Sequence, residues 1–105
     1  MAKLNMVKAL NLALHEEMER DPDVLVIGED VGVDGGVFRV TEDLHRKFGS
    51  KRVIDSPLAE AAIIGTSVGM ALYGLKPVCE IQFSGFAFQC FHQIENHAAR
   101  YRMRS

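Results

Sequence analysis

Several residue types are scarce in this sequence, and each scarcity narrows the class of protein. The 105 residues include no tryptophan and only two cysteines, Cys79 and Cys90. The two cysteines form no C-x-x-C pair, which excludes a scaffold built on disulfides and predicts reduced thiols in a cytoplasmic protein. A long uncharged apolar run is also missing, because the most apolar stretch, Val53 to Gly74, contains Glu60. The sequence therefore predicts neither a signal peptide nor a membrane span.

Neither sign of charge is in large excess. Twelve basic and 14 acidic side chains give a formal net charge of −2. This balance gives no indication of a nucleic-acid partner. The arginines near the end, Arg100, Arg102 and Arg104, are better explained by a solvated or subunit-facing surface.

Apolar periodicity and helix-stop signals predict an alternation of helices and strands. "VLVIG" at Val24–Gly28 is typical of a strand that is buried on both faces. Asn5 and Thr41 are expected helix caps, and Pro57 is the expected first residue of a third helix. The fold class is therefore α/β, a parallel sheet with helices on both faces, and three strands indicate an incomplete domain over residues 1–105. The predicted helices cover 5–20, 41–49, 57–75 and 84–103, and the predicted strands cover 24–28, 52–56 and 76–83.

Glu60 is the residue that most needs an explanation, because an unpaired buried charge costs several kcal/mol. Counted from Pro57 it is the fourth helical residue, where a carboxylate interacts favourably with the helix dipole. However, Ala-Ala-Ile-Ile-Gly follows it and leaves little polar surface. Glu60 is therefore either a helix-terminus residue or a working acid.

Other motifs each leave two interpretations open. "GED" at Gly28–Asp30 follows a strand, so its acids either line a site or cap a turn. Gly65 and Gly69, four residues apart, allow close helix approach within the domain or at a subunit interface. The glycine-rich Val33–Phe38 lacks phosphate-loop spacing and predicts a mobile loop.

A zinc site is not predicted. Cys90, His92 and His97 have the spacing C-x-H-x4-H, which does not match the spacings of metal ligands on a helix.

A family resemblance emerges from four motifs taken together. "GED", "GGVFR", "DSPLAE" and "EIQF" occur in this order between residues 28 and 83. The sequence closely resembles the beta subunit of the thiamine-diphosphate-dependent decarboxylating component of 2-oxo acid dehydrogenase complexes, of the pyruvate or branched-chain type. The resemblance covers nearly the whole chain, but only the N-terminal part of the family's pyrimidine-binding domain.

The resemblance implies roles for particular residues. Glu60 corresponds to the family's glutamate that shares a proton with the aminopyrimidine ring of thiamine diphosphate and favours its imino tautomer. Phe86 corresponds to the aromatic that packs on this ring, and Leu58 to an apolar residue of the same pocket. Gln82 resembles a residue near the substrate carboxylate, and Glu29 an acid in a polar channel between paired active sites. The helix with Gly65 and Gly69 resembles a subunit-contact helix.

The resemblance also implies partners. The family's motif for the diphosphate and Mg²⁺ is absent from this sequence and belongs to an alpha subunit, so an alpha2-beta2 heterotetramer is expected, together with a 2-oxo acid and a lipoyl-bearing acyltransferase. His92 departs from the family, because many relatives have an acid there, and Ser56 replaces a threonine. The alternatives are a truncated, non-catalytic subunit-association module and a transketolase-like pyrimidine domain.

Overall fold

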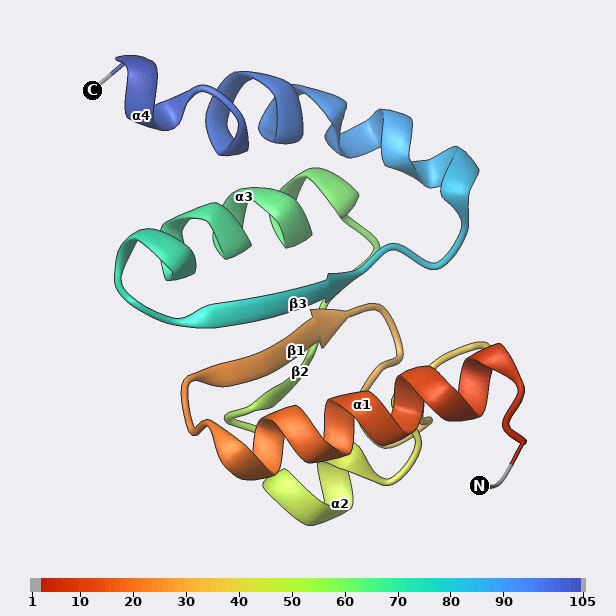
Figure 1. The fold of residues 1–105 in the computed structure, drawn as a ribbon. Helices are drawn as coiled ribbons and strands as arrows, with labels where there is room; N and C mark the ends of the chain where they lie inside the picture. Colours follow the sequence, from red (N-terminus) through yellow and green to blue (C-terminus); the bar gives the residue numbers. More distant parts are fainter. Residues whose placement is uncertain (1–2, 105) are drawn as a thin grey trace.

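The computed structural model describes residues 3–104 and confirms the predicted α/β architecture (Figure 1). Three helix–strand pairs are followed by a helical segment in three pieces, and none of the described helices is long and apolar enough to cross a membrane. The pairs are α1 (Met6–Arg20) with β1 (Val24–Gly28), α2 (Leu44–Phe48) with β2 (Val53–Asp55), and α3 (Glu60–Leu72) with β3 (Lys76–Glu80). The last pieces are the 3-10 helix η1 (Ser84–Cys90), the π-helical turn η2 (Gln93–Ala98) and the short α4 (Tyr101–Arg104).

The strands form one parallel sheet in the order β2-β1-β3. Gly28, the last residue of β1, lies opposite Asp55 on one side and Glu80 on the other. Figure 1 shows α1 and α2 on one side of the strands, and α3 with the C-terminal helical segment on the other. All three strands therefore end at one edge, where open α/β sheets bind their ligands.

The core is centred on β1, in which every residue is buried, as its unbroken apolar sequence predicts. Burying each Leu, Ile, Val or Met side chain stabilises the fold by roughly 1.5–3 kcal/mol. The buried side chains around β1 form an apolar cluster, which is therefore the main source of stability. The cluster contains Met18, Val24, Val26, Val31, Leu44 and Val53, with Leu14 and Phe48 packed against it.

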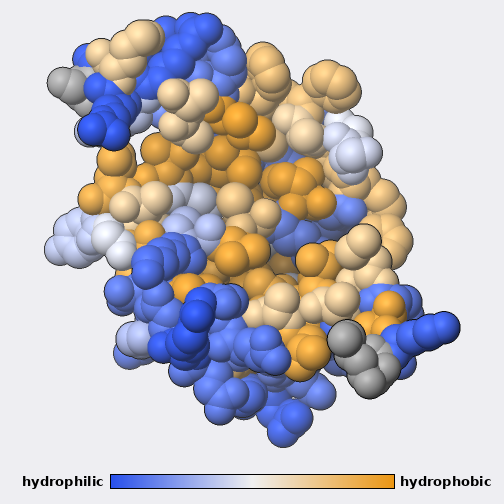
Figure 2. Space-filling view, viewed as in Figure 1, coloured by the Kyte–Doolittle hydropathy of each residue, from blue (hydrophilic) through white to orange (hydrophobic). Residues whose placement is uncertain are grey.

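The apolar stripe of α1 is only partly covered. The helix begins as predicted, with the Asn5 side chain accepting a hydrogen bond from the Lys8 N–H at 2.9 Å. Met18 is buried, but Met6 and Leu10 are exposed. The reason is that β3 is the edge strand of the described sheet, and its outer side leaves part of α1 uncovered. Figure 2 shows the resulting apolar surface in the middle of the face on which β3 and α3 lie in Figure 1.

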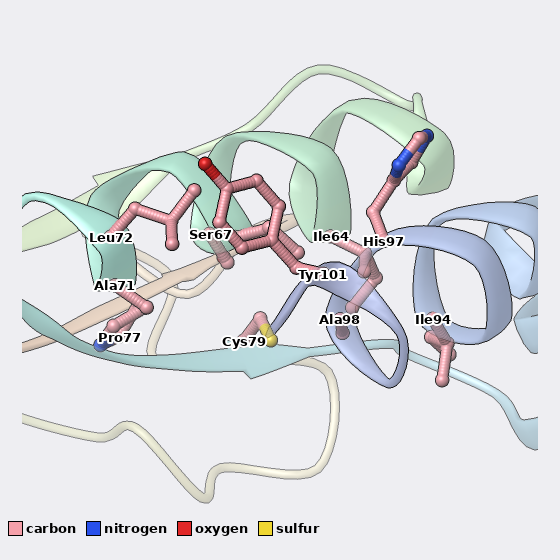
Figure 3. A pocket seen from close by; sticks show the side chains of 11 residues that line it. Ile64, Ser67, Ala71, Leu72, Pro77, Cys79, Ile94, His97, Ala98 and Tyr101 are labelled. Atoms are coloured by element: carbon pink, nitrogen blue, oxygen red, sulfur yellow. The ribbon is translucent and has the colours of Figure 1, made fainter. Parts of the chain in front are cut away.

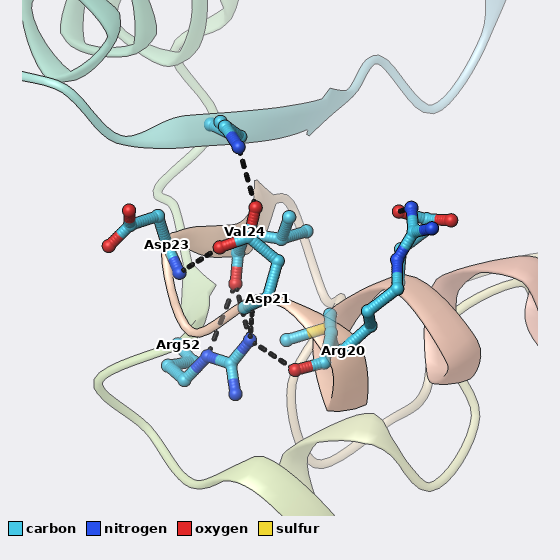
Figure 4. A network of polar contacts seen from close by, with 8 residues as sticks. Arg20, Asp21, Asp23, Val24 and Arg52 are labelled. Carbon is cyan, nitrogen blue, oxygen red and sulfur yellow. Dashed lines mark hydrogen bonds and ion pairs between the residues drawn. The ribbon is translucent and has the colours of Figure 1, made fainter.

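Arg52 joins the end of α1 to the start of β1 (Figure 4). Its Nη2 atom lies 2.7 Å from the carbonyl oxygen of Met18, 2.9 Å from that of Asp21 and 2.8 Å from that of Val24. Its guanidinium carbon also lies 4.9 Å from the centre of the Phe48 ring. One side chain thus bonds the Met18 carbonyl, which the end of the helix leaves without an intrahelical partner, and joins it to the connection and to β1.

Two predicted helix starts are wrong. α3 begins at Glu60, and the Ser56 hydroxyl donates to the Pro57 carbonyl oxygen at 2.8 Å and does not cap the helix. α2 begins at Leu44, because the Thr41 hydroxyl donates to the Val31 carbonyl oxygen inside the core. The predicted stop of α2 at Gly49 is confirmed, with φ of +85°.

The predicted single C-terminal helix is also wrong. It is divided into η1, η2 and α4, and its apolar side chains Phe88, Phe91 and Ile94 are exposed. Without a continuous surface to bury this stripe, the segment does not gain the packing that stabilises most protein helices. β3 likewise ends at Glu80, three residues before the predicted end of that strand at residue 83.

Candidate active site

Carboxyl groups gather where the strands end. Glu29 follows β1 directly, Asp55 ends β2, Glu80 ends β3, and Glu60 is the first residue of α3. Glu29 and Glu60 are buried, with exposed fractions of 3% and 8%. The structure therefore brings together Glu29 and Glu60, two acids that lie 31 positions apart in the sequence.

The carboxyl groups of Glu29 and Glu60 act on each other directly. Interaction with the Glu60 carboxyl, then burial, then the charges of Glu60, Asp30 and Glu80 raise the pKa of Glu29 to about 7. Neither carboxylate oxygen of Glu29 has a regular hydrogen-bond partner within residues 3–104. The two groups therefore face each other short of full hydrogen-bond geometry, and they retain unused bonding capacity for a ligand.

Replacing Glu29 with glutamine is expected to change how stability depends on pH. Between about pH 4.5 and 7 the folded chain holds a proton on Glu29 that the unfolded chain has lost, so stability falls as the pH rises through this window. The Gln variant stays neutral and should lose this dependence, gaining on the order of 3 kcal/mol over the parent at pH 8 while matching it near pH 4. Urea unfolding across this range checks it, with Glu16→Gln on the exposed face of α1 as control. Parallel stability curves for parent and Glu29→Gln would contradict the assignment.

Glu80 is an acid that the sequence analysis did not single out. One of its oxygens, Oε2, is buried without a hydrogen-bond partner among the described residues, and burial raises the pKa of this carboxyl. A Cβ atom placed on Gly28 would lie 3.1 Å from the Glu80 Cβ, so a glycine is needed for the strands to meet at this point. The available signal was the position of this acid at the start of the "EIQF" motif.

The glycine-rich loop is held by several hydrogen bonds, and its mobility stays a prediction. The Gly36 N–H donates to the Asp30 carbonyl oxygen at 2.7 Å, and the Gly32 N–H donates to Asp55 Oδ1 at 2.8 Å. Gly35 and Gly36 are buried and have φ of +76° and +82°, values that favour glycine. The loop is thus fastened to the turn that carries Glu29.

The remaining predicted site residues lie at different distances from this centre. The Gln82 side-chain amide donates to the Glu29 carbonyl oxygen at 3.4 Å and to Asp30 Oδ2 at 3.3 Å, so it belongs to the acidic turn. Phe86 lies in η1, which packs on α3, and is 40% exposed. Leu58 is 82% exposed, so the described chain leaves most of its side chain open to solvent. Its role in a pyrimidine pocket stays a prediction.

The two helix glycines differ in their surroundings. A Cβ on Gly65 would lie 3.2 Å from Oε1 of Gln93, so this glycine allows close packing within the chain. A Cβ on Gly69 would have no described atom within 4 Å. The open side of Gly69 leaves room for a second subunit, and the interface assignment of both glycines stays a prediction.

The two histidines are closer than an α-helix would place them. The π-helical turn brings the rings of His92 and His97 to a centroid distance of 5.1 Å. Cys90 is buried, and its thiol donates to the Ala87 carbonyl oxygen at 3.2 Å. The described residues contain no group of three or more His, Cys, Asp or Glu side chains that could hold a metal ion.

An apolar groove of about 470 Å³ lies away from the acids, between α3, β3 and the C-terminal helical segment (Figure 3). Ile64, Leu72, Cys79, Ile94 and Tyr101 are among its lining residues. None of Glu29, Glu60 and Gln82 contributes to it. The groove is therefore a separate surface.

A family match identifies the class of protein to which this fold and this acid pair belong. Residues 2–105 match the family described as transketolase, pyrimidine binding domain. The chain belongs to this family.

Particular relatives are more informative still. The chain is 55% identical over 105 residues to the pyruvate dehydrogenase E1 component subunit beta of Staphylococcus epidermidis, covering 100% of this chain and 32% of that protein. The proteins of the same name from Acholeplasma laidlawii and Staphylococcus aureus strain Mu50 are 51% and 54% identical over the same length and coverage. The chain thus spans about a third of the length of these relatives.

Proposed function

We propose that this chain is the pyrimidine-binding part of the beta subunit of a 2-oxo acid dehydrogenase, which decarboxylates a 2-oxo acid with thiamine diphosphate. The observation that carries the proposal is the position of Glu60. It is buried at the first residue of α3, at the carboxyl edge of the sheet, next to a second buried acid whose oxygens have no regular partner in the described chain. Support for the enzyme class comes from the similarity to pyruvate dehydrogenase E1 beta subunits.

The residues present fit an aminopyrimidine ring. Such a ring offers nitrogen atoms that accept or donate a proton, and a buried carboxyl is the matching partner. Glu60 would share a proton with the ring, and its buried position would strengthen this contact, since a low local dielectric strengthens hydrogen bonds. Phe86 would pack on the face of the ring. When bound, the cofactor supplies the carbon that adds to the 2-oxo acid and accepts the electrons released with CO₂.

Glu29 would serve as the proton store beside Glu60. With a pKa of about 7, its carboxyl both holds and releases a proton near neutral pH. The Gln82 amide, on the Glu29 carbonyl oxygen and the Asp30 side chain, would keep this turn in place and extend toward the substrate carboxylate. These roles agree with an acid channel and a substrate contact at the same edge of the sheet.

The diphosphate half of the cofactor would be held elsewhere. The sequence has no GDG motif followed by an asparagine pair, and we assign diphosphate and Mg²⁺ binding to an alpha subunit in an alpha2-beta2 assembly. The acyl group would then pass to a lipoyl group on an acyltransferase. A cytoplasmic location follows from this role.

Calorimetry with thiamine diphosphate and Mg²⁺ tests the half-site. Neither the beta subunit alone nor the alpha subunit alone should show strong binding, whereas the mixed pair should bind tightly, because the pyrimidine and diphosphate contacts then act together. Glu60→Gln in the mixed pair should weaken binding less than removal of Mg²⁺. One-to-one binding at about micromolar Kd by the beta subunit alone would reject the proposal.

The non-catalytic association module explains fewer observations. The uncovered edge of β3 and the apolar groove suit a protein that associates with other chains. A module without a ligand, however, gains nothing from two facing buried acids, which destabilise the folded chain at neutral pH. The transketolase-like alternative is less favoured, because the three relatives from Staphylococcus and Acholeplasma are dehydrogenase subunits.

A further inference from the structure

Three phenylalanine rings form a row beside the acid pair's edge of the sheet. The rings of Phe38 and Phe83 lie 5.4 Å apart between centroids at an angle of 76°, and those of Phe83 and Phe86 lie 5.5 Å apart at the same angle. Both contacts have the edge-to-face geometry that aromatic pairs prefer. Phe83 is thus the middle ring and touches both neighbours.

The row connects three separate segments. Phe38 belongs to the glycine-rich loop, Phe83 lies between β3 and η1, and Phe86 lies within η1. The loop end is anchored independently, because Gly36 donates to the Asp30 carbonyl oxygen and the Thr41 hydroxyl to that of Val31. These hydrogen bonds therefore hold the backbone beside Phe38 against the turn that carries Glu29.

Phe83 restrains Phe86 in two ways. Its ring is partly exposed, and its segment is a 3-10 helix, in which hydrogen-bond geometry is poorer than in an α-helix. The Phe86 N–H donates to the Phe83 carbonyl oxygen at 2.9 Å, so the same residue restrains both its backbone and its ring. Among the aromatic contacts of the described residues, Phe86 has one ring partner, which is Phe83.

We propose that Phe83 is a positioning residue that fixes the orientation of the Phe86 ring for stacking on the aminopyrimidine, with Phe38 as its support from the glycine-rich loop. This proposal rests on the function proposed above. The proposal gives the glycine-rich loop a role, the support of the Phe83 ring, which the sequence alone did not indicate. It also explains why a large apolar side chain stays half-exposed at Phe83.

The test measures cofactor affinity and turnover in the assembled alpha–beta enzyme. Each edge-to-face pair corresponds to about a two- to tenfold change in an equilibrium constant. Phe83→Leu should therefore bind thiamine diphosphate about three- to tenfold more weakly, with turnover at saturating cofactor within about twofold of the parent. Phe83→Tyr keeps the ring and should restore the affinity. Phe88→Leu, in the same segment but 83% exposed and outside the row, should change neither quantity.

Phe86→Ala separates failure of the inference from failure of the proposed function. If Phe86→Ala leaves cofactor affinity unchanged, the proposed stacking contact is wrong and the inference falls with it. If Phe86→Ala weakens binding but Phe83→Leu does not, only the positioning role is wrong. The double variant should bind no more weakly than Phe86→Ala, because Phe83 acts through Phe86. Additive losses, or equal losses of melting temperature and affinity in Phe83→Leu, would overturn the positioning role.

Discussion

Replacing Glu60 with glutamine is expected to lower turnover of the assembled enzyme by about 10²–10⁴-fold, the usual contribution of a general acid or base. Glutamine keeps the size of the side chain but cannot share a proton with the cofactor ring. Fold and assembly should be retained, since the described chain shows no ion pair to Glu60. The measurement is turnover with saturating cofactor beside the melting temperature of the same preparation.

The alternative role of Glu60 predicts a different result. A carboxylate in the first turn of a helix contributes only about 0.3–1 kcal/mol through the helix dipole. In that case Glu60→Gln would be slightly less stable and fully active. Glu19→Gln is a suitable control, because Glu19 lies on the exposed face of α1 and pairs only with Lys47 at 3.1 Å among the described ion pairs. A stable, fully active Glu60→Gln enzyme would remove the basis of the proposed function.

Replacing Arg52 with methionine is expected to cause a large loss of stability. The substitution removes the common donor of the Met18, Asp21 and Val24 carbonyl groups, of which Asp21 keeps the Val24 N–H at 3.2 Å as a second donor. Leaving buried acceptors unpaired costs about 1–3 kcal/mol each where water cannot replace the donor, so the free energy of unfolding should fall by about 2–4 kcal/mol at this partly buried site. Urea unfolding monitored by circular dichroism measures it.

Two further variants show whether hydrogen bonding is the cause. Arg52→Lys keeps a charge but has no planar fork and should recover only part of the loss. Arg46→Met removes an exposed arginine that pairs with Asp43 at 3.4 Å, and it should change stability by less than about 1 kcal/mol. If Arg52→Met and Arg46→Met lowered the free energy of unfolding by the same small amount, the hydrogen bonds of Arg52 would not stabilise the contact between α1 and β1.

Local signals in the sequence determined the type and the order of the elements in the three helix–strand pairs. The unbroken apolar run Val24–Gly28 is typical of a strand buried on both faces, and Asn5 and Gly49 mark helix ends through their own backbone and side-chain chemistry. Glu60 was also recognisable, because an acid before a long apolar stretch is unusual. Such features depend on neighbours along the chain, and the sequence displays those neighbours directly.

Contacts between distant segments could not be found in this way. The breaks in the predicted last helix, the start of α3 at Glu60 and the inward hydroxyl of Thr41 each depend on what surface lies opposite, as does the packing of Gln93 against Gly65. The pairing of Glu29 with Glu60, the burial of Glu80 and the row of rings through Phe83 arise only when parallel strands end at one edge. The sequence by itself thus determined which residues can do chemistry, whereas the tertiary structure decided which of them meet, because burial and proximity are properties of the packed chain.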